Sequence, residues 1–438
     1  MFFGRKMMPL LILLGVLGLP ALALRIGCVG RSCDEQTAAA SEVPFCSLDP
    51  GLRSRIEAGF REGRSPEVLT IARDEGISGG SGYRKTDGAT AWPSPELEAA
   101  RIPIAFAGPG VTQMELPAGA TVDQIAPTLT ELIGFERPFP EVRSGTALEG
   151  VAGGDDAPAL ILQVIYKGIG STELEASRAA WPYLEELMDV GAATMDGDVG
   201  ALPLDPAAVL STIGAGGPPR QHGVTGTFMR NERGELVRAF SPRAEVPIIA
   251  TLADDLDEAM AQEPLIGLVG TSLTDRGVIG GDWYVGGDED EVVIAPKNQI
   301  GPAVDMLSDG FGDDDVTDLM TVVMEGRIGQ LDRGLKAIVS AAEKAADGSV
   351  ALAVTATGSA VDGGVDGASF VALVDEAVGE AVTEAAVPGG FFLDQRALIN
   401  AGVSEDLVVD ELERLGGRDE DFFGDVFPAI AVSFARYC

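Results

Sequence analysis

The only histidine of this 438-residue chain, His222, lies in the stretch STIGAGGPPRQHGVTG, between a glycine-rich turn and a second turn. Histidine serves proteins as a general base, as a metal ligand or as a hydrogen-bonding group of the scaffold. No Gly-x-Ser-x-Gly elbow with a partner histidine is visible, so the sequence pairs His222 with no serine nucleophile. Because Pro218, Pro219 and Gly223 flank it, we expect His222 to hydrogen-bond backbone within a turn.

Two acidic stretches, GGDEDE from Gly286 and DGFGDDD from Asp309, are rich in the oxygen ligands that calcium prefers. Neither stretch matches the spacing of an EF-hand loop. In a chain this negative, runs of carboxylates are typical of solvated loops, and we interpret both stretches in that way.

Buried strands alternate with helical patterns over most of the chain. The clearest strand is the run PALILQVIYKGIG, whose apolar residues alternate little, as in a parallel strand covered on both faces. Further strands are predicted at residues 102–111, 246–253, 264–270 and 350–358, and helices at 121–134, 172–190, 254–262, 326–346 and 371–386. This alternation predicts an α/β fold with a doubly wound, mostly parallel sheet.

In such a sheet, ligands bind beyond the carboxyl ends of the strands. Residues 167–170, 271–276 and 355–359 follow the predicted strands at those ends. The Gly-x-Gly at 168–170 resembles the start of a dinucleotide-binding loop, but Glu173 stands where the third glycine would be. A nicotinamide cofactor is therefore not expected.

The net charge restricts the partners that this chain can bind, and the N-terminal sequence indicates its compartment. With 31 Lys and Arg against 68 Asp and Glu, the formal net charge is −37, which disfavours binding to nucleic acid or to anionic membranes. Two basic residues precede the apolar run MMPLLILLGVLGLPALAL, which ends in a small-residue cleavage pattern. We predict a signal peptide over residues 1–23 and a polar lead-in over 24–42. The alternative is an uncleaved membrane anchor, against which the prolines of the run argue.

The four cysteines, Cys28, Cys33, Cys46 and Cys438, all lie in the two terminal parts of the chain. An even number of cysteines in an exported chain predicts disulfides, and four cysteines allow three pairings. Zinc binding is the alternative, but the spacing of Cys28 and Cys33 without a nearby histidine does not favour it.

Several strand-end segments together resemble the alkaline phosphatase superfamily, near its type I phosphodiesterase/nucleotide pyrophosphatase branch. TIGAGGPPRQHGVTG is similar to a family stretch that ends Thr-Gly-x-x-Pro-x-x-His-Gly, and IGLVGTSLTDRGVIGGDWY resembles the branch's Ser-Leu-Lys-Asp-Arg-Gly segment. GFREGRSPEVLTI, IPIAFAGPGV and IAPTLTELIGF resemble the C-terminal part of the family. The histidine of the family stretch is not a metal ligand, so the resemblance implies that His222 belongs to the scaffold.

The order of these segments implies a circular permutation. Residues 43–151 resemble the portion that closes the family fold, yet they precede the core portion, 157–360. Residues 361–438 would complete the same domain. Permutation is tolerated where the original termini lie close together at the surface.

The permuted family fold also implies a cysteine pairing. Cys46 and Cys438 would lie on the two sides of the original continuous chain, close enough to form a disulfide. Cys28 would then pair with Cys33.

The resemblance implies a family site from which this chain departs. The family binds two zinc-like cations through aspartates and histidines around a Thr or Ser nucleophile. Here Lys167 stands at the position of the opening-strand aspartate, and Pro206, beside Asp205, stands at the nucleophile position. Where the family has Thr-Ala-Asp-His-Gly, Thr357 replaces the aspartate and Gly358 the histidine. A single histidine cannot restore such a centre.

Two cationic residues remain at matched positions. The ammonium of Lys167 can replace the charge of a lost metal and pair with Asp205, or the side chain can simply reach solvent. Arg276 matches the family arginine that contacts phosphate, whereas the neighbouring lysine position is Thr274. The resemblance thus implies a degenerate pocket of Lys167, Asp205, Arg276 and Thr357 that retains affinity for a small anion.

We therefore expect an exported, metal-free and catalytically degenerate relative with a binding or structural role, whose partner is a small anion or a cell-surface molecule. The alternative is a phosphoester hydrolase that holds a divalent metal through Asp and Thr oxygens. Turnover of a phosphate ester and metal content separate the two hypotheses.

Overall fold

The computed structural model describes residues 44–72, 93–94, 98–154, 157–244, 247–281, 283–284, 290–360, 367–416 and 423–438. Its largest element is an eight-stranded sheet. In spatial order the strands are β3 (Met114–Glu115), β5 (Ala192–Asp198), β2 (Arg101–Ala107), β11 (Val350–Ala356), β4 (Leu160–Tyr166), β10 (Asp318–Met324), β8 (Ile266–Gly270) and β9 (Glu291–Ile294). Of these eight, only β2 runs against its neighbours.

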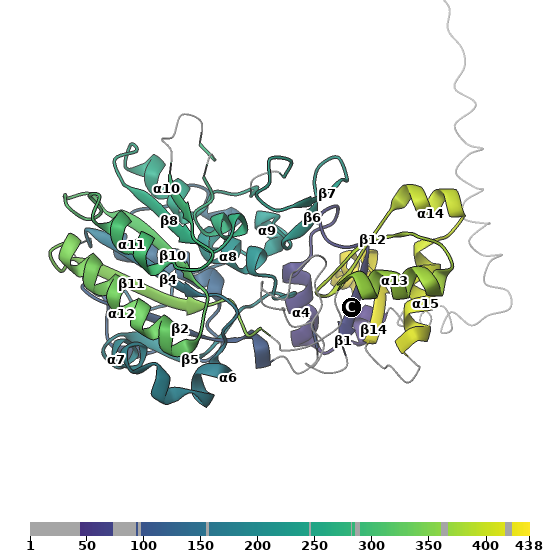
Figure 1. The fold of residues 1–438 in the computed structure, drawn as a ribbon, viewed down its shortest axis with the longest axis horizontal. Helices are drawn as coiled ribbons and strands as arrows, with labels where there is room; N and C mark the ends of the chain where they lie inside the picture. The colour runs from purple at the N-terminus through teal and green to yellow at the C-terminus, as the bar shows by residue number, and fades with distance from the viewer. Residues whose placement is uncertain are drawn as a thin grey trace, which may run out of the picture.

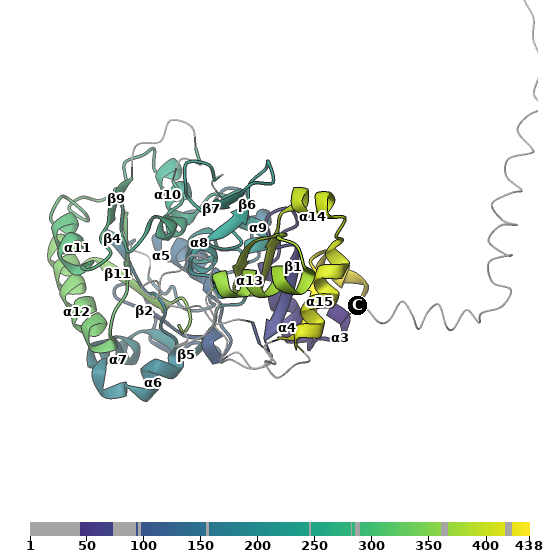
Figure 2. The ribbon, with the colours of Figure 1, turned by 45° about the vertical axis from the view of Figure 1, so that its right-hand side comes forward.

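Helices cover both faces of this sheet, as Figure 2 shows in three layers. On one face lie α7 (Pro182–Val190), α11 (Ile300–Leu307) and α12 (Ile328–Ala345), and on the other lie α5 (Ile125–Ile133), α8 (Pro206–Ala215) and α10 (Leu252–Ala259). Every residue of β4, β10 and β11 is buried, which explains why their apolar residues do not alternate. The predicted doubly wound, mostly parallel α/β fold is confirmed.

A second, four-stranded sheet joins both ends of the chain. Its order is β12 (Thr383–Val387), β13 (Gly390–Leu393), β1 (Val68–Ala72) and β14 (Phe423–Pro428). The helices α13 (Gly367–Val378) and α15 (Glu405–Gly416) pack against it on a core of its own, where Phe370, Phe391 and Phe423 are in mutual ring contact. The described part of 361–438 therefore adds no strand to the large sheet (Figure 1).

Three predicted elements differ in the structure. Residues 247–251 form no strand, because Thr251 caps α10, which begins at the next residue. The helix predicted at 172–190 is divided into α6 (Ser171–Ala176) and α7, which begins at Pro182, a residue suited to the first helical position. The helix predicted at 371–386 ends at Val378, and β12 occupies the end of that segment.

The small sheet is bound to the rest of the molecule by the buried Arg230, which ends β6 (Phe228–Arg230). Its guanidinium forms ion pairs with Glu67 and Glu384 and donates to the carbonyl oxygen of Leu393 at 2.7 Å. The same group lies over the ring of Phe392, 5.3 Å from its centroid. A planar, multiply donating guanidinium suits such a junction.

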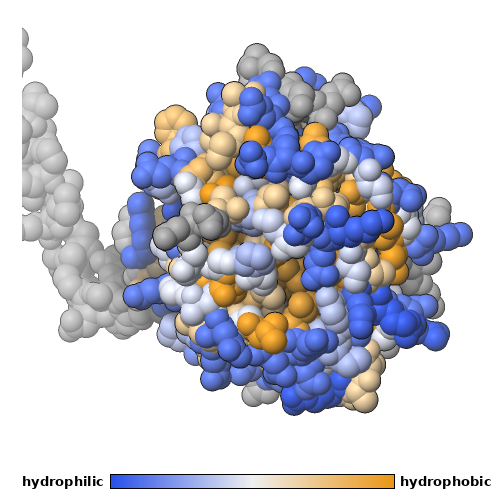
Figure 3. All heavy atoms as spheres, turned by 90° about the vertical axis from the view of Figure 1, so that its left-hand side faces the viewer, coloured by the Kyte–Doolittle hydropathy of each residue, from blue (hydrophilic) through white to orange (hydrophobic). Residues whose placement is uncertain are grey.

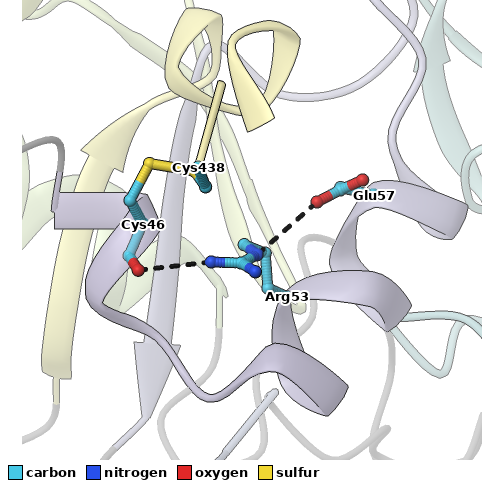
Figure 4. Close-up of a disulfide and its surroundings, with 4 residues drawn as sticks. All are labelled: Cys46, Arg53, Glu57 and Cys438. Atoms are coloured by element: carbon cyan, nitrogen blue, oxygen red, sulfur yellow. Dashed lines mark hydrogen bonds and ion pairs between the residues drawn. A yellow bond between two sulfur atoms is a disulfide. The ribbon is translucent and has the colours of Figure 1, made fainter. Parts of the chain in front are cut away.

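A disulfide joins Cys46 in α3 (Pro44–Ser47) to Cys438, with 5.2 Å between their Cα atoms (Figure 4). The predicted pairing is thus confirmed for this bridge, whereas Cys28 and Cys33 lie outside the described residues. Arg53 donates to the carbonyl oxygen of Cys46 at 3.2 Å and lies 3.8 Å from Glu57 in α4 (Pro50–Gly59). The bridge fixes the first described helix to the end of the chain.

The surface carries small apolar patches among hydrophilic side chains, as the face in Figure 3 shows. Within the described ranges, no helix combines the length and the hydropathy needed to cross a bilayer.

Candidate functional site

Lys167 lies at the carboxyl end of β4, one residue beyond the strand. Its amide donates to the carbonyl oxygen of Met324 at 2.9 Å, which extends the ladder with β10. Its ammonium donates to the hydroxyl of Thr271 at 2.9 Å and forms an ion pair with Asp275, whose Oδ1 also lies at 2.9 Å. The Lys167 side chain is 11% exposed and that of Asp275 is 0% exposed, so this ion pair is buried.

Asp275 is held in place by its own segment, the 3₁₀ helix η5 (Leu273–Val278). Its Oδ2 accepts hydrogen bonds from the amide of Thr271 at 2.7 Å and from the amide of Ser272 at 3.1 Å. Ser272 is the N-cap of η5, and Asp275, three residues later, forms a capping box with it. Sequence reasoning missed Asp275 as the partner of Lys167, although the Ser-x-x-Asp pattern of this box was visible.

Asp205 does not pair with Lys167, so that predicted contact is wrong. Asp205 is the N-cap of α8, and its Oδ1 accepts from the amide of Ala207 and from the hydroxyl of Thr227, both at 2.9 Å. Pro206 occupies the first helical position, where the missing N–H leaves no partner unsatisfied. A carboxylate at a helix N-terminus also interacts favourably with the helix dipole, so Asp205 stabilises the start of α8.

The cavity beside Asp205 is too small for an organic ligand. It lies between α4, β1 and the start of α8, and its volume is about 30 Å³. A water needs roughly 10–15 Å³ on this measure, so the space suits about two waters. The cavity that Asp205 lines is therefore smaller than a ligand-sized pocket.

Thr357 ties the ends of β4 and β11 together. Its hydroxyl oxygen accepts the amide of Gly168 at 3.0 Å, and Gly168 has a left-handed φ of 71°. Next to it, Ser359 donates to Glu173 Oε2 at 2.6 Å, and the same oxygen accepts the amide of Gly170 at 2.8 Å. These contacts hold the loop between the strand ends in one conformation.

Arg276 follows Asp275 but its side chain turns to another part of the chain. Its Nε donates to the carbonyl oxygen of Gly280 at 3.2 Å, and its Nη2 lies 3.7 Å from Asp290. The side chain is 35% exposed. Lys167 and Thr357 thus lie at adjacent strand ends, and neither forms a side-chain hydrogen bond with Arg276 or Asp205.

His222 is a fully buried scaffold residue, as predicted. Its Nδ1 accepts the amide of Val224 at 3.1 Å, so the neutral ring carries its proton on Nε2, which lies 3.0 Å from the hydroxyl oxygen of Thr212. Burial, and then the charges of Arg64 and Arg61, lower the pKa of His222 to about 3. The ring is therefore neutral at physiological pH and connects α8 to the following turn.

No group of three or more His, Cys, Asp and Glu side chains is placed to hold a metal ion in the part of the chain that the structure describes. No family model matches the sequence, and no curated protein matches it. A solved structure of alkaline phosphatase PafA matches 61% of this chain and 78% of its own chain, with 14% identity and a TM-score of 0.47. Phosphonoacetate hydrolase from Sinorhizobium meliloti 1021, in complex with phosphonoacetate, matches 61% of this chain and 80% of its own, with 14% identity and a TM-score of 0.37.

Proposed function

We propose that this chain is an exported relative of the alkaline phosphatase superfamily hydrolases that acts by binding and does not catalyse ester hydrolysis. The observation that carries the proposal is the ion pair between Lys167 and Asp275 at the carboxyl end of β4. In the family that the sequence resembles, an aspartate at this position binds a catalytic cation. Here an ammonium stands there and is already neutralised by a buried carboxylate.

The side chains at these strand ends do not fit a two-zinc centre. Zinc takes thiolate, imidazole and carboxylate ligands, whereas Lys167 presents a protonated amine and Thr357 a hydroxyl that accepts an amide proton. Asp275 accepts four hydrogen bonds from residues 271 and 272 besides its pair with Lys167. A cation placed beside Lys167 would be repelled by the ammonium.

Export is part of the same proposal. The N-terminal residues follow the order of a secretory signal, and the bridge between Cys46 and Cys438 is of the kind that persists in oxidising compartments. Peptide mapping of the unreduced, purified protein tests the second point. A free thiol at Cys438 in protein from the culture medium would contradict it.

Hydrolysis of nitrophenyl phosphate mono- and diesters by the purified full-length chain tests the central claim, with zinc, magnesium, manganese or calcium added in turn. We expect no turnover above the buffer rate with any of these ions. The matched controls are Asp205→Asn and Lys167→Met, because a contaminating phosphatase would act equally in both preparations. Turnover that needs a divalent metal and is abolished by Asp205→Asn would overturn the proposal in favour of a hydrolase with an oxygen-ligand metal site.

A further inference from the structure

A cavity of about 300 Å³ opens at the carboxyl edge of the large sheet, between α11 and α12. Its walls come from three segments: the loop after β9 with the start of α11, the end of β10, and the first turns of α12. Pockets for small ligands begin at about this volume. The cavity is about ten times larger than the space beside Asp205, since 300 Å³ compares with 30 Å³.

The lining of this cavity is polar and carries two cations. Lys297 and Arg333 lie on it with the amide side chains of Asn298 and Gln330, and among the described residues Glu325 is the one acidic group on it. Within the described residues, neither cation forms an ion pair with a carboxylate. The lining thus carries one positive charge in excess, although the chain as a whole has 68 acidic and 31 basic residues.

The start of one helix adds to this positive character. α11 begins at Ile300, which lines the cavity. The free amides at a helix N-terminus favour negative charge within about one turn. Their contribution has the same sign as the charges of Lys297 and Arg333.

From the volume, the cations and the amide groups together, we propose that this cavity binds a small organic anion that carries a phosphoryl or carboxylate group and one or more hydroxyl groups. The fork of Arg333 suits the oxygens of such a group, and Lys297 supplies a second, mobile charge. Asn298 and Gln330 each offer a donor and an acceptor, which is what hydroxyl groups require. The lining is thus suited to bind a hydroxylated anion in preference to a purely apolar ligand.

The cavity is distinct from the site around Lys167. Tyr166 and Lys167 are successive residues at the end of β4, so their side chains leave the sheet on opposite faces. The side chain of Lys167 reaches η5, which packs with α8, whereas the cavity lies between α11 and α12 on the other face. Anion binding here does not depend on whether the chain hydrolyses esters.

Isothermal titration of the full-length chain with inorganic phosphate, glycerol 3-phosphate and malate tests the proposal, and amide hydrogen exchange locates the site. At least one of these probes should bind at millimolar concentration or below and slow exchange at residues 297–300 and 328–334. Arg333→Gln and Lys297→Gln should each weaken that binding about tenfold or more. The matched control is Lys336→Gln, three residues along the same helix, where the exposed ammonium lies 5.4 Å from the ring centroid of Tyr183 and lines no part of the cavity.

The three probes also separate the sources of the anion. Binding of inorganic phosphate as tight as that of glycerol 3-phosphate would show that the phosphoryl group alone is recognised, whereas preference for malate would assign a carboxylate ligand. Binding of none of the three at millimolar concentration would overturn the proposal. Binding that survives both cavity variants but is lost in Lys167→Met would overturn it as well, because the anion would then occupy the strand-end site.

Discussion

At the carboxyl edge of the large sheet, the two faces differ in whether their polar and charged side chains have partners inside the fold. On the face of α8 and η5, every group that suggested chemistry already has a partner inside the fold: Lys167 has Asp275, Asp205 caps α8, and His222 bonds Thr212. On the face of α11 and α12, the cations Lys297 and Arg333 line an open cavity. Similar residue types thus serve stability on one face and remain available to a ligand on the other.

The largest expected effect comes from removing the carboxylate of Asp275, which pairs with Lys167 on the face of α8 and η5. Asp275→Ala deletes the partner of Lys167 and the capping-box carboxylate of η5, so we expect the free energy of unfolding to fall by about 3 to 5 kcal/mol. Urea denaturation followed by circular dichroism measures it. The control is Glu185→Ala, which removes an exposed pair with Arg178 and should cost less than about 1 kcal/mol. Equal midpoints for the two variants would show that the buried Lys167–Asp275 pair stabilises the fold no more than the exposed pair does.

His222 gives the next effect, as a dependence on pH. Its folded pKa, lowered to about 3, lies below the unfolded value of 6.5, so the unfolded chain binds the proton first. The stabilisation is complete above pH 6.5 and is lost as the pH falls, by roughly 3 kcal/mol between pH 6.5 and pH 4. The difference in unfolding free energy between wild type and His222→Gln should shrink by this amount over that range. A constant difference would mean that the pKa of His222 is the same in the folded and the unfolded chain.

Lys167→Met should have a smaller effect than Asp275→Ala. The methionine has a similar length and removes the charge, but Asp275 keeps its hydrogen bonds from Thr271 and Ser272. We therefore expect a loss of about 1.5 to 3 kcal/mol, the value of one hydrogen bond to a charged group. If Lys167→Met lost more unfolding free energy than Asp275→Ala in the same urea series, Lys167 would contribute more to stability than Asp275, which would contradict this prediction.

The sequence predicted four strands of the large sheet, β2, β4, β8 and β11, because they are continuous apolar runs, and it missed β3, β5, β9 and β10. It was not sufficient for the small sheet, whose strands pair across long separations: Val68 is opposite Phe391 on one side and Pro428 on the other. Local patterns do not encode such a register. The bridge between Cys46 and Cys438 was nonetheless predicted, because the order of the family-like segments implied that the two ends meet.

Of the four residues of the expected pocket, the structure places Lys167 and Thr357 at adjacent strand ends, and Asp205 and Arg276 have other partners. The partner of Lys167 could not be read from the sequence, because Asp275 reaches it across β10 from the end of β8, and strand order is a tertiary property. The cavity between α11 and α12 was missed for the same reason, since its lining comes from three segments.

The smallest effect should come from the open face. Arg333 is exposed and forms no ion pair with a described carboxylate, so Arg333→Gln removes a charge on which the fold does not rely. We expect its urea midpoint to match wild type within about 0.5 kcal/mol of unfolding free energy, as for ordinary surface changes. Because the chain is strongly acidic overall, losing a cation adds a little repulsion, and a slightly lower midpoint at low salt that recovers at high salt would agree with this. A loss of several kcal/mol of unfolding free energy at all salt concentrations would show that Arg333 stabilises α12 itself. The contrast between the two faces of the sheet would then be wrong.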